Sequence, residues 1–456
     1  MKRNTRRIIF TACVVAFLLF IPYIVLYSLG YRVNIASLSI VATGGIYVHA
    51  LPENANVTID GAIQDTTGLF SNAFFVQNLV PGPHTVSIAK DGYFDYQKTL
   101  PVAENQVTKL EHVVLFKKTP AFSILQDDIN LVAGSPDGTL IISAATTTKN
   151  VILSIYNTTT ADPKLLTLAI ANATTGKAIW SADSKNVVLV ISGNYYLVNA
   201  TAATPKATLL PYLENTSHIS FDSQNSSVIF YVKNKNLYSD AVDLNQAMPL
   251  FSNALAYVKN GSNIMWLSGD GFLNSFDTIV KSSQKVTAAP LGMKNNSSYK
   301  LLQVSGNTFL FENEAVYLLD TVAAAFVPFY SSAIDMKVSP NGDKTLLYGN
   351  HELLYFLNTA TAGELKIIPL QTTASNIAQA DWVNDDYIIF TAGDTIMISE
   401  AHPIGNVNII ALPSTISPAD GSAIAVTSPD IYFSSATKKL YLLAGKILLV
   451  SERLLP

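Results

Sequence analysis

A turn motif that recurs about every 40 residues constrains the fold of this chain of 456 residues more than any other feature. Its clearest copy is Ser339-Pro340-Asn341-Gly342, which separates two apolar stretches at residues 334–338 and 345–348. The second residues of successive copies are 34 to 46 positions apart. Five copies precede the clearest one: Ser135-Pro136-Asp137-Gly138, Ser181-Ala182-Asp183-Ser184, Asp222-Ser223-Gln224-Asn225, Lys259-Asn260-Gly261 and Ser305-Gly306-Asn307. Two follow it: Asn384-Asp385-Asp386 and a degenerate Ser428-Pro429-Asp430.

Each interval between two markers contains four short apolar stretches, which is the pattern of a propeller blade. Residues 178–180, 187–191, 195–198 and 207–210 form one such set. A single four-stranded sheet cannot bury both of its faces, whereas radial stacking covers each sheet with its neighbours. Residues 119–456 are therefore predicted to form an all-β propeller with eight blades. Seven blades is the alternative, because the last marker is degenerate and the two ends of the repeat region could complete one blade together.

Aromatic side chains at matching positions of the repeats are predicted to pack between blades rather than to bind a ligand. They are Trp180, Phe221, Tyr257 and Trp382.

The markers resemble those of TolB-like and related WD-type propellers of the bacterial envelope. In that family the motif is a turn between the first two strands of a blade, with Pro fixing φ and Gly taking a positive φ. The resemblance implies a scaffold that mostly binds proteins and has no common catalytic set.

An uncharged segment at residues 8–29 is predicted to be a transmembrane helix. As a helix it would be about 33 Å long, which matches a hydrocarbon core of about 30 Å. Lys2, Arg3, Arg6 and Arg7 precede it and place residues 1–7 in the cytoplasm, with the bulk of the chain outside the membrane. A cleaved signal peptide is the alternative, but the apolar run is longer than the usual 7 to 15 residues or so.

After a connector at residues 30–43, residues 44–117 alternate between apolar and polar side chains. Ile46, Val48 and Ala50 share one face, and Ala55, Val57 and Ile59 follow before a turn at Asp60-Gly61. Further strands are predicted at residues 84–89 and around Val107, Leu110 and Val113. The pattern predicts a small all-β sandwich.

This segment resembles the PEGA domain, a family of small extracytoplasmic β-modules. The resemblance rests on Pro52-Glu53-Asn54-Ala55, on Leu79, Pro81 and Gly82 before a strand, and on Lys90-Asp91-Gly92-Tyr93. Asn54 stands where the family has Gly, a change that a left-handed turn tolerates, and residues 66–75 form a longer loop than usual. The resemblance implies an accessory surface module without catalytic residues.

The distribution of reactive residues argues against several kinds of chemistry. The net charge is -4 and no arginine lies between Arg32 and Arg453, which disfavours nucleic-acid binding. Cys13 is the sole cysteine, so no intrachain disulfide forms. The chain has no GxSxG, Walker A or GxGxxG motif, and Asp127-Asp128 and Asp385-Asp386 are predicted to be solvated turn residues. The histidines, scattered without a metal-ligand spacing, are His49, His84, His112, His218, His351 and His402.

We therefore predict no catalytic residues, no metal site and no cofactor. Asn341, Asp343 and His351 stand near two turns. Asn341 belongs to the recurring turn motif, and Asp343 and His351 are not repeated in the other copies, so the three are interpreted as turn residues. The predicted function is that of a membrane-anchored binding or scaffold protein of the bacterial cell envelope, whose rim loops bind a protein or polysaccharide. The alternatives are a hydrolase or lyase with its site in the central channel, and a purely structural spacer.

Overall fold

The fold was analysed in a computed structural model that describes residues 3–28, 30–34, 39–66, 72–160, 163–242, 246–358, 365–418 and 421–456. Part of the predicted connector, residues 35–38, and part of the predicted long loop, residues 67–71, lie outside the described residues. The chain divides into two compact units. One comprises Met1–Thr119, His402–Asn408 and Leu455–Pro456, and the other comprises Pro120–Ala401 and Ile409–Leu454.

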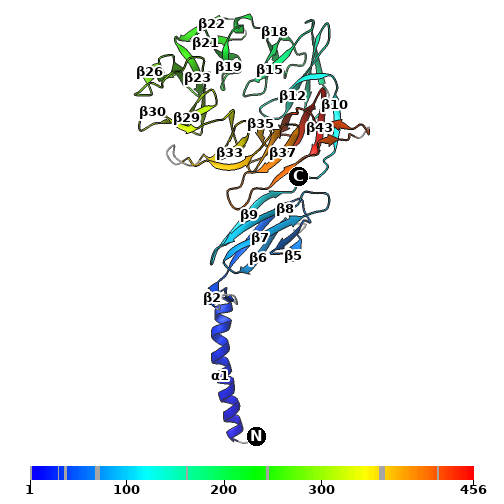
Figure 1. Cartoon of the computed structure of the whole chain (residues 1–456), viewed down its shortest axis with the longest axis vertical. Helices are drawn as coiled ribbons and strands as arrows, with labels where there is room; N and C mark the ends of the chain where they lie inside the picture. The colour runs from blue at the N-terminus through cyan, green and yellow to red at the C-terminus, as the bar shows by residue number, and fades with distance from the viewer. Residues whose placement is uncertain are drawn as a thin grey trace. The chain divides into compact units, whose positions relative to one another are not determined.

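Helix α1 (Arg3–Ser28) contains nearly all of the predicted transmembrane segment and begins a few residues earlier (Figure 1). Its stretch Thr5–Ser28 is long and apolar enough to cross a membrane, a property that signal sequences share. The apolar side chains of Phe10 and Leu19 are 70% and 69% exposed, so no other part of the described chain covers them.

The rest of the first unit is a β-sandwich, as predicted. A hairpin of β1 (Tyr31–Asn34) and β2 (Ser39–Ala42) precedes it. One sheet has the order β6 (Ala73–Leu79), β3 (Gly44–Leu51), β9 (Val107–Val114), and the other has β5 (Ala62–Thr66), β4 (Asn56–Ile59), β7 (Gly82–Ala89), β8 (Tyr96–Val102). Strands β3 and β9 are parallel. The core between the sheets includes all six predicted inward residues, Ile46, Val48, Ala50, Ala55, Val57 and Ile59.

Two details of the sandwich test the sequence interpretation. Asn54 has a φ of 58°, so this position does require the left-handed conformation that Asn tolerates. Val107 begins β9, in the predicted strand, and its side chain is 47% exposed. Leu110 and Val113 are buried three residues apart because His112, with a φ of 64°, interrupts the alternation between them.

Within the described residues the second unit contains eight four-stranded antiparallel sheets, which are the eight predicted blades (Figure 1). Blade one consists of β11 (Ile129–Gly134), β12 (Leu140–Thr146), β13 (Val151–Asn157) and β14 (Pro163–Leu168), and blade two of β15 (Thr175–Trp180), β16 (Asn186–Ile191), β17 (Asn194–Asn199) and β18 (Ala207–Leu209). Blade three consists of β19 (Ser217–Phe221), β20 (Val228–Lys233), β21 (Asn236–Ala241) and β22 (Gln246–Phe251), and blade four of β23 (Ala254–Asn260), β24 (Asn263–Ser268), β25 (Leu273–Asp277) and β26 (Ser282–Lys285).

Blades five to seven follow in the same order along the chain. They are β27 (Tyr299–Val304), β28 (Asn307–Glu312), β29 (Ala315–Asp320), β30 (Ala325–Tyr330); β31 (Asp335–Val338), β32 (Lys344–Tyr348), β33 (Glu352–Leu357), β34 (Ile368–Thr372); and β35 (Ile377–Trp382), β36 (Tyr387–Ala392), β37 (Thr395–Glu400), β38 (Ile409–Ala411). A short helix η1 (Pro211–Leu213) follows β18, and a hairpin of β39 (Thr415–Ile416) and β40 (Ile424–Ala425) follows β38.

The eighth blade is completed by both ends of the propeller sequence. Its strands are β41 (Asp430–Ser434), β42 (Lys439–Ala444) and β43 (Ile447–Arg453), and β10 (Phe122–Gln126) pairs with β43 as the outermost strand. The two ends of the repeat region therefore do complete one blade together, but the propeller has eight blades rather than the alternative of seven. The interpretation of Ser428-Pro429-Asp430 as the eighth marker is wrong, because these residues lead into the first strand of the blade, and the turn between its first two strands lies between Ser434 and Lys439.

Serine and carboxylate or amide side chains hold the marker turns, in addition to the predicted Pro and Gly. In the copy at 339–342, Ser339 Oγ donates to Asn341 Oδ1 at 2.8 Å and accepts the N–H of Lys344 at 3.0 Å. Ser135 and Ser181 make the same two bonds to Asp137 and Leu140 and to Asp183 and Asn186. The fourth marker residue has the predicted positive φ, at 77° for Gly138 and 83° for Gly342. The recurrence of Ser and Asp or Asn thus has a hydrogen-bonding cause.

The marker turns also connect neighbouring blades at several seams. Asp137 N–H donates to Ser184 Oγ in the second blade at 3.2 Å, and Asn186 Nδ2 donates to the Ser226 carbonyl in the third at 3.0 Å. At the closing seam, Ser434 Oγ donates to the Gly138 carbonyl at 2.6 Å. These bonds join blades at one end of their first strands, where side-chain packing alone would leave polar turns in contact.

The aromatic side chains at matching repeat positions pack between blades, as predicted. Tyr257 packs against Phe230 of the preceding blade with ring centroids 6.1 Å apart, and its hydroxyl donates to the Phe230 carbonyl at 2.8 Å. Trp382 Nε1 donates to the Lys337 carbonyl of the preceding blade at 2.8 Å. Trp180 and Phe221 pack on clusters that each combine two neighbouring blades.

We expect Gly138→Ala to destabilise the propeller more than Gly342→Ala. Both glycines have a positive φ, for which Ala costs about 1–2 kcal/mol. A Cβ at Gly342 would meet nothing within 4 Å, whereas one at Gly138 would lie 2.9 Å from the backbone nitrogens of Ser435 and Ala436 in the closing blade. That overlap should cost a further 1–3 kcal/mol or so. Urea unfolding of the two variants measures the difference, and equal losses would show that the seam is not tightly packed at Gly138.

Candidate functional site

The first strands of the blades surround the propeller axis, where they contact one another from blade to blade. Such contacts join β41 to β11, β11 to β15, β31 to β35 and β35 to β41. A cavity of about 630 Å³ opens among them. Its walls include residues from the first strands of blades one, two, six, seven and eight. Within the propeller it is therefore a place where distant parts of the sequence meet, and we define it as the axial cavity.

An ion pair between neighbouring blades lies in the wall of the axial cavity. Lys337 Nζ, from β31, is 2.6 Å from Asp381 Oδ2, from β35. The two side chains are 35% and 48% exposed, so solvent still reaches both charges. Asp381 Oδ1 also accepts the N–H of Trp382 at 2.8 Å, which fixes the orientation of the carboxylate. An ion pair this exposed adds little to the stability of the fold, and its main effect is to fix where the two charges lie.

A second carboxyl group faces the same cavity from blade eight. Asp430 Oδ1 accepts a hydrogen bond from Gln379 Nε2 at 2.5 Å, and Gln379 Oε1 accepts the N–H of Ile431 at 2.8 Å. Gln379 is thereby held at both ends of its amide group. Burial raises the pKa of Asp430 above its ordinary value, and the hydrogen bond from Gln379 opposes the increase without cancelling it.

Tyr432 links this carboxyl-rich wall to the first blade. Its hydroxyl donates to the Ser135 carbonyl at 2.7 Å. Burial raises the pKa of Tyr432, and the negative charges of Asp137 and Asp381 raise it further. The phenol therefore stays protonated and reports a negative potential on this side of the cavity.

Basic side chains lie on the first strands of other blades. Lys177 on β15, His218 on β19 and Lys300 on β27 are near enough that both lysines influence the imidazole. Burial lowers the pKa of His218, and the two lysine charges lower it further. Lys300 Nζ also pairs with Asp335 Oδ1 at 2.6 Å. Lys177 and Lys300 thus lie on other first strands than Asp381 and Asp430, and Lys300 is paired with a carboxylate of blade six.

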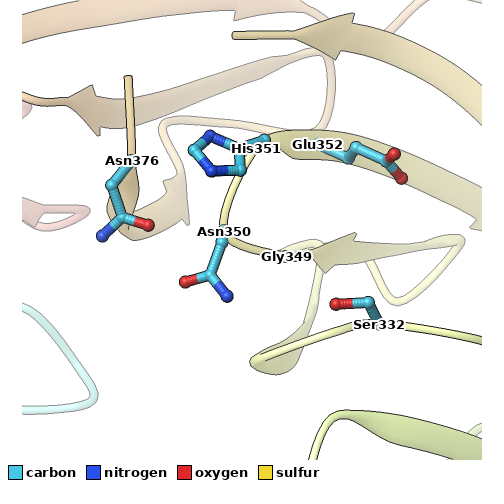
Figure 2. Close-up of a pocket in the computed structure, with 6 residues that line it drawn as sticks. All are labelled: Ser332, Gly349, Asn350, His351, Glu352 and Asn376. Atoms are coloured by element: carbon cyan, nitrogen blue, oxygen red, sulfur yellow. The ribbon is translucent and has the colours of Figure 1, made fainter. Parts of the chain in front are cut away.

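A smaller cavity of about 260 Å³ lies beside the turn between β32 and β33 of blade six (Figure 2). The lining includes Ser332, Asn350, His351, Glu352 and Asn376, and the Glu352 side chain is directed away from His351 and Asn350. Asn350 and Ser332 donate to the two carboxylate oxygens of Glu314, at 3.1 and 2.7 Å.

His351 lies in the second turn of its blade, whereas Asn341 and Asp343 lie in the first. The two turns are at opposite ends of β32, so these three residues do not form a common site, in agreement with their interpretation as turn residues.

The prediction that the two pairs of adjacent aspartates are solvated turn residues holds in full for one pair only. Asp127 and Asp128 are exposed, as predicted. Asp385 and Asp386 lie in the turn between β35 and β36, as predicted, but they are partly buried against the preceding blade. Asp385 Oδ1 accepts the Asn341 N–H at 2.8 Å, and Asp386 Oδ1 pairs with Lys344 Nζ at 2.8 Å. Among the described residues, no group of three or more His, Cys, Asp or Glu side chains could hold a metal ion. The absence of catalytic residues and of a cofactor stays a prediction.

Sequence analysis did not identify the residues of the axial cavity. Lys337, Gln379, Asp381 and Asp430 stand in first strands whose apolar residues alone were used to recognise the repeat. A signal was present, since pairs of polar residues two positions apart, such as Gln379 and Asp381, share one side of a strand. Their convergence depends on ring closure, which no local pattern specifies.

Comparison with known proteins supports both parts of the architecture. Residues 43–115 match the PEGA domain family. The C-terminal WD40 domain of Sif2 matches over 73% of this chain and 99% of its own length, with 11% identity and a TM-score of 0.50. The designed protein Ika8 matches 74% of this chain and 99% of its own, with 10% identity and a TM-score of 0.47. The Cps50 (Swd1) propeller domain of Myceliophteria thermophila matches 64% and 100%, with 11% identity and a TM-score of 0.39.

No curated protein matched the sequence. The likeness to the Sif2 domain establishes the β-propeller fold. The chain therefore combines a segment that matches the PEGA domain family with an eight-bladed β-propeller.

We expect Asp430→Asn to stabilise the propeller at pH 7. The raised pKa of Asp430 means that the folded protein holds this proton more tightly than the unfolded chain. The corresponding stability is present below the ordinary pKa of 3.8 and is lost as the pH rises through the folded pKa. Asn keeps an acceptor for Gln379 and carries no charge. Thermal unfolding should show a higher Tm for the variant at pH 7 and little difference near pH 3.5.

The exposed Asp127→Asn substitution is the control, because it removes the same charge outside the cavity. A lower Tm for Asp430→Asn at pH 7 would contradict the burial argument.

Proposed function

We propose that this chain is a membrane-anchored, extracytoplasmic binding protein of the bacterial cell envelope, and that its propeller holds a protein or polysaccharide partner at the axial cavity. The observation that carries the proposal is the axial cavity itself. Its walls come from five blades, and its charged groups are held by hydrogen bonds and an ion pair before any ligand arrives. Such preorganisation lowers the entropic cost of binding.

Four other features support the location outside the membrane. Helix α1 is long and apolar enough to serve as an anchor. PEGA domains are typical of extracellular proteins, and residues 43–115 match this family. The basic residues before the helix favour a cytoplasmic N-terminus. The turn chemistry of the repeats resembles that of TolB-like propellers, which supports an envelope role for the propeller.

An enzyme is the second candidate, and one observation favours it. Asp381 and Asp430 come from different blades and face the same cavity, and a carboxyl group with a raised pKa is a frequent component of acid and base catalysis. However, Lys337 neutralises Asp381 and Gln379 engages Asp430, so neither group is placed as a free base. A binding function requires no further group and is therefore preferred.

The topology can be tested with the native cysteine and one engineered cysteine. We expect Ser283→Cys, on an exposed outer strand of blade four, to react with a membrane-impermeant maleimide in intact cells. Cys13, inside α1, should stay unlabelled until the membrane is dissolved. Labelling of Ser283→Cys only after lysis would place the propeller in the cytoplasm and contradict the proposal.

Photo-crosslinking tests the binding site itself. We expect a photoreactive benzophenone side chain at Ser435, an exposed residue of the axial cavity wall, to form a discrete covalent adduct in native membranes. The same group at Ser283, far from the cavity lining, is the matched control and should form none. Equal adducts at both positions, or none at Ser435, would argue against the axial cavity as the binding site.

A further inference from the structure

We infer that the axial cavity receives a cationic side chain, the ammonium of lysine or the guanidinium of arginine, from a peptide partner. The inference rests on the proposed function and specifies the chemistry of the partner. It is carried by the balance of charges in the cavity wall, by the way Asp430 is held, and by the apolar surfaces beside it.

The fixed charges favour a cation on the side of blades seven and eight. Asp381 and Asp430 line the cavity there, and Lys337 is the cation that accompanies them. Lys337 already lies 2.6 Å from Asp381, so its charge is largely offset. Asp137, near Tyr432, adds to the negative potential. An anionic group entering this side would meet uncompensated negative charge, whereas a cation would supply the missing positive charge.

Asp430 is placed as an acceptor for such a group. The Gln379 amide donates to one carboxylate oxygen and is itself fixed by the Ile431 N–H, so the carboxyl group cannot turn away without breaking both bonds. Gln379 is neutral and leaves the charge of the carboxylate uncompensated. A charge-assisted hydrogen bond from an ammonium or guanidinium group would replace the solvation that burial removes.

The cavity wall also offers contacts for an aliphatic chain. Val132, Ala178 and Val338 line it beside the polar groups. Lysine and arginine carry three or four methylene groups behind their charge, and these pack on apolar surface while the head group remains paired. A neutral sugar would gain little from the charges and would leave Asp430 without a countercharge.

The basic residues of blades two, three and five restrict where the cation can settle. Lys177 would repel it from its own side of the axis, whereas the charge of Lys300 is largely offset by Asp335. His218, whose pKa is lowered by burial, adds no negative charge that could attract a cation. The field across the axis therefore directs a cationic side chain toward Asp430.

The test is calorimetric titration of the full chain in detergent micelles with the blocked peptide acetyl-Gly-Ala-Lys-Ala-Gly-amide. We expect binding that weakens at least tenfold when the lysine is Nε-acetylated, because acetylation removes the charge and keeps the stem. Asp430→Asn should weaken binding of the lysine peptide by a similar factor. Asp127→Asn, which removes an exposed charge outside the cavity, should leave it unchanged.

Several results would overturn the inference. Equal affinity for the lysine and acetyl-lysine peptides would do so even if Asp430→Asn failed to fold, since this comparison uses the natural chain. Binding of chitotetraose that is insensitive to Asp430→Asn would instead favour a neutral polysaccharide partner. Absence of peptide binding together with a persistent adduct at Ser435 would reject the cation and keep the proposed function, whereas absence of both would reject the two together.

Discussion

Burial of both faces of every four-stranded sheet by its neighbours is the constraint on which the propeller depends. Six apolar clusters combine side chains of two successive blades, including one that joins Ile129 and Val132 of the first blade to Tyr441 and Leu448 of the eighth. An isolated blade would expose these residues to water, which costs about 25 cal/mol of free energy per Å² of apolar surface. Every blade needs two neighbours, so the stable arrangement is a closed ring.

Ring closure also creates the axial cavity. Strand β10 completes the outer edge of blade eight, while β41 of the same blade reaches the axis and contacts β11. The approach is close at Gly134, where a Cβ would lie 1.9 Å from the ring of Tyr432. Glycine therefore permits the Tyr432 ring to cross this position and bond to Ser135. The same closure brings Asp430 beside Gln379, so the seam that completes the fold also completes the carboxyl-rich wall.

The sequence predicted the parts that depend on local periodicity and turn chemistry. Ser339 and Asn341 build a turn that recurs, so the blades, their strand order and the interblade position of Tyr257 could be recognised. The eighth marker was misplaced because Ser428-Pro429-Asp430 has turn composition but precedes a strand. The axial residues were missed for a different reason: Lys337 and Asp381 are 44 positions apart and meet only through the packing of adjacent blades.

The pKa of Asp430 is raised, whereas the pKa of the marker carboxylate Asp137 is lowered, so the two charges affect the stability of the fold in opposite ways. Asp137 accepts bonds from Ser135 and Thr139, which keep its pKa low despite the opposing effect of burial, so this charge stabilises the fold. Asp430 has the opposite shift, and its ionised form costs the folded state free energy at neutral pH. A residue that only served the fold would do so better as Asn. A cation bound beside Asp430 would offset this cost, so the carboxyl group suits the binding that we infer better than a purely structural role.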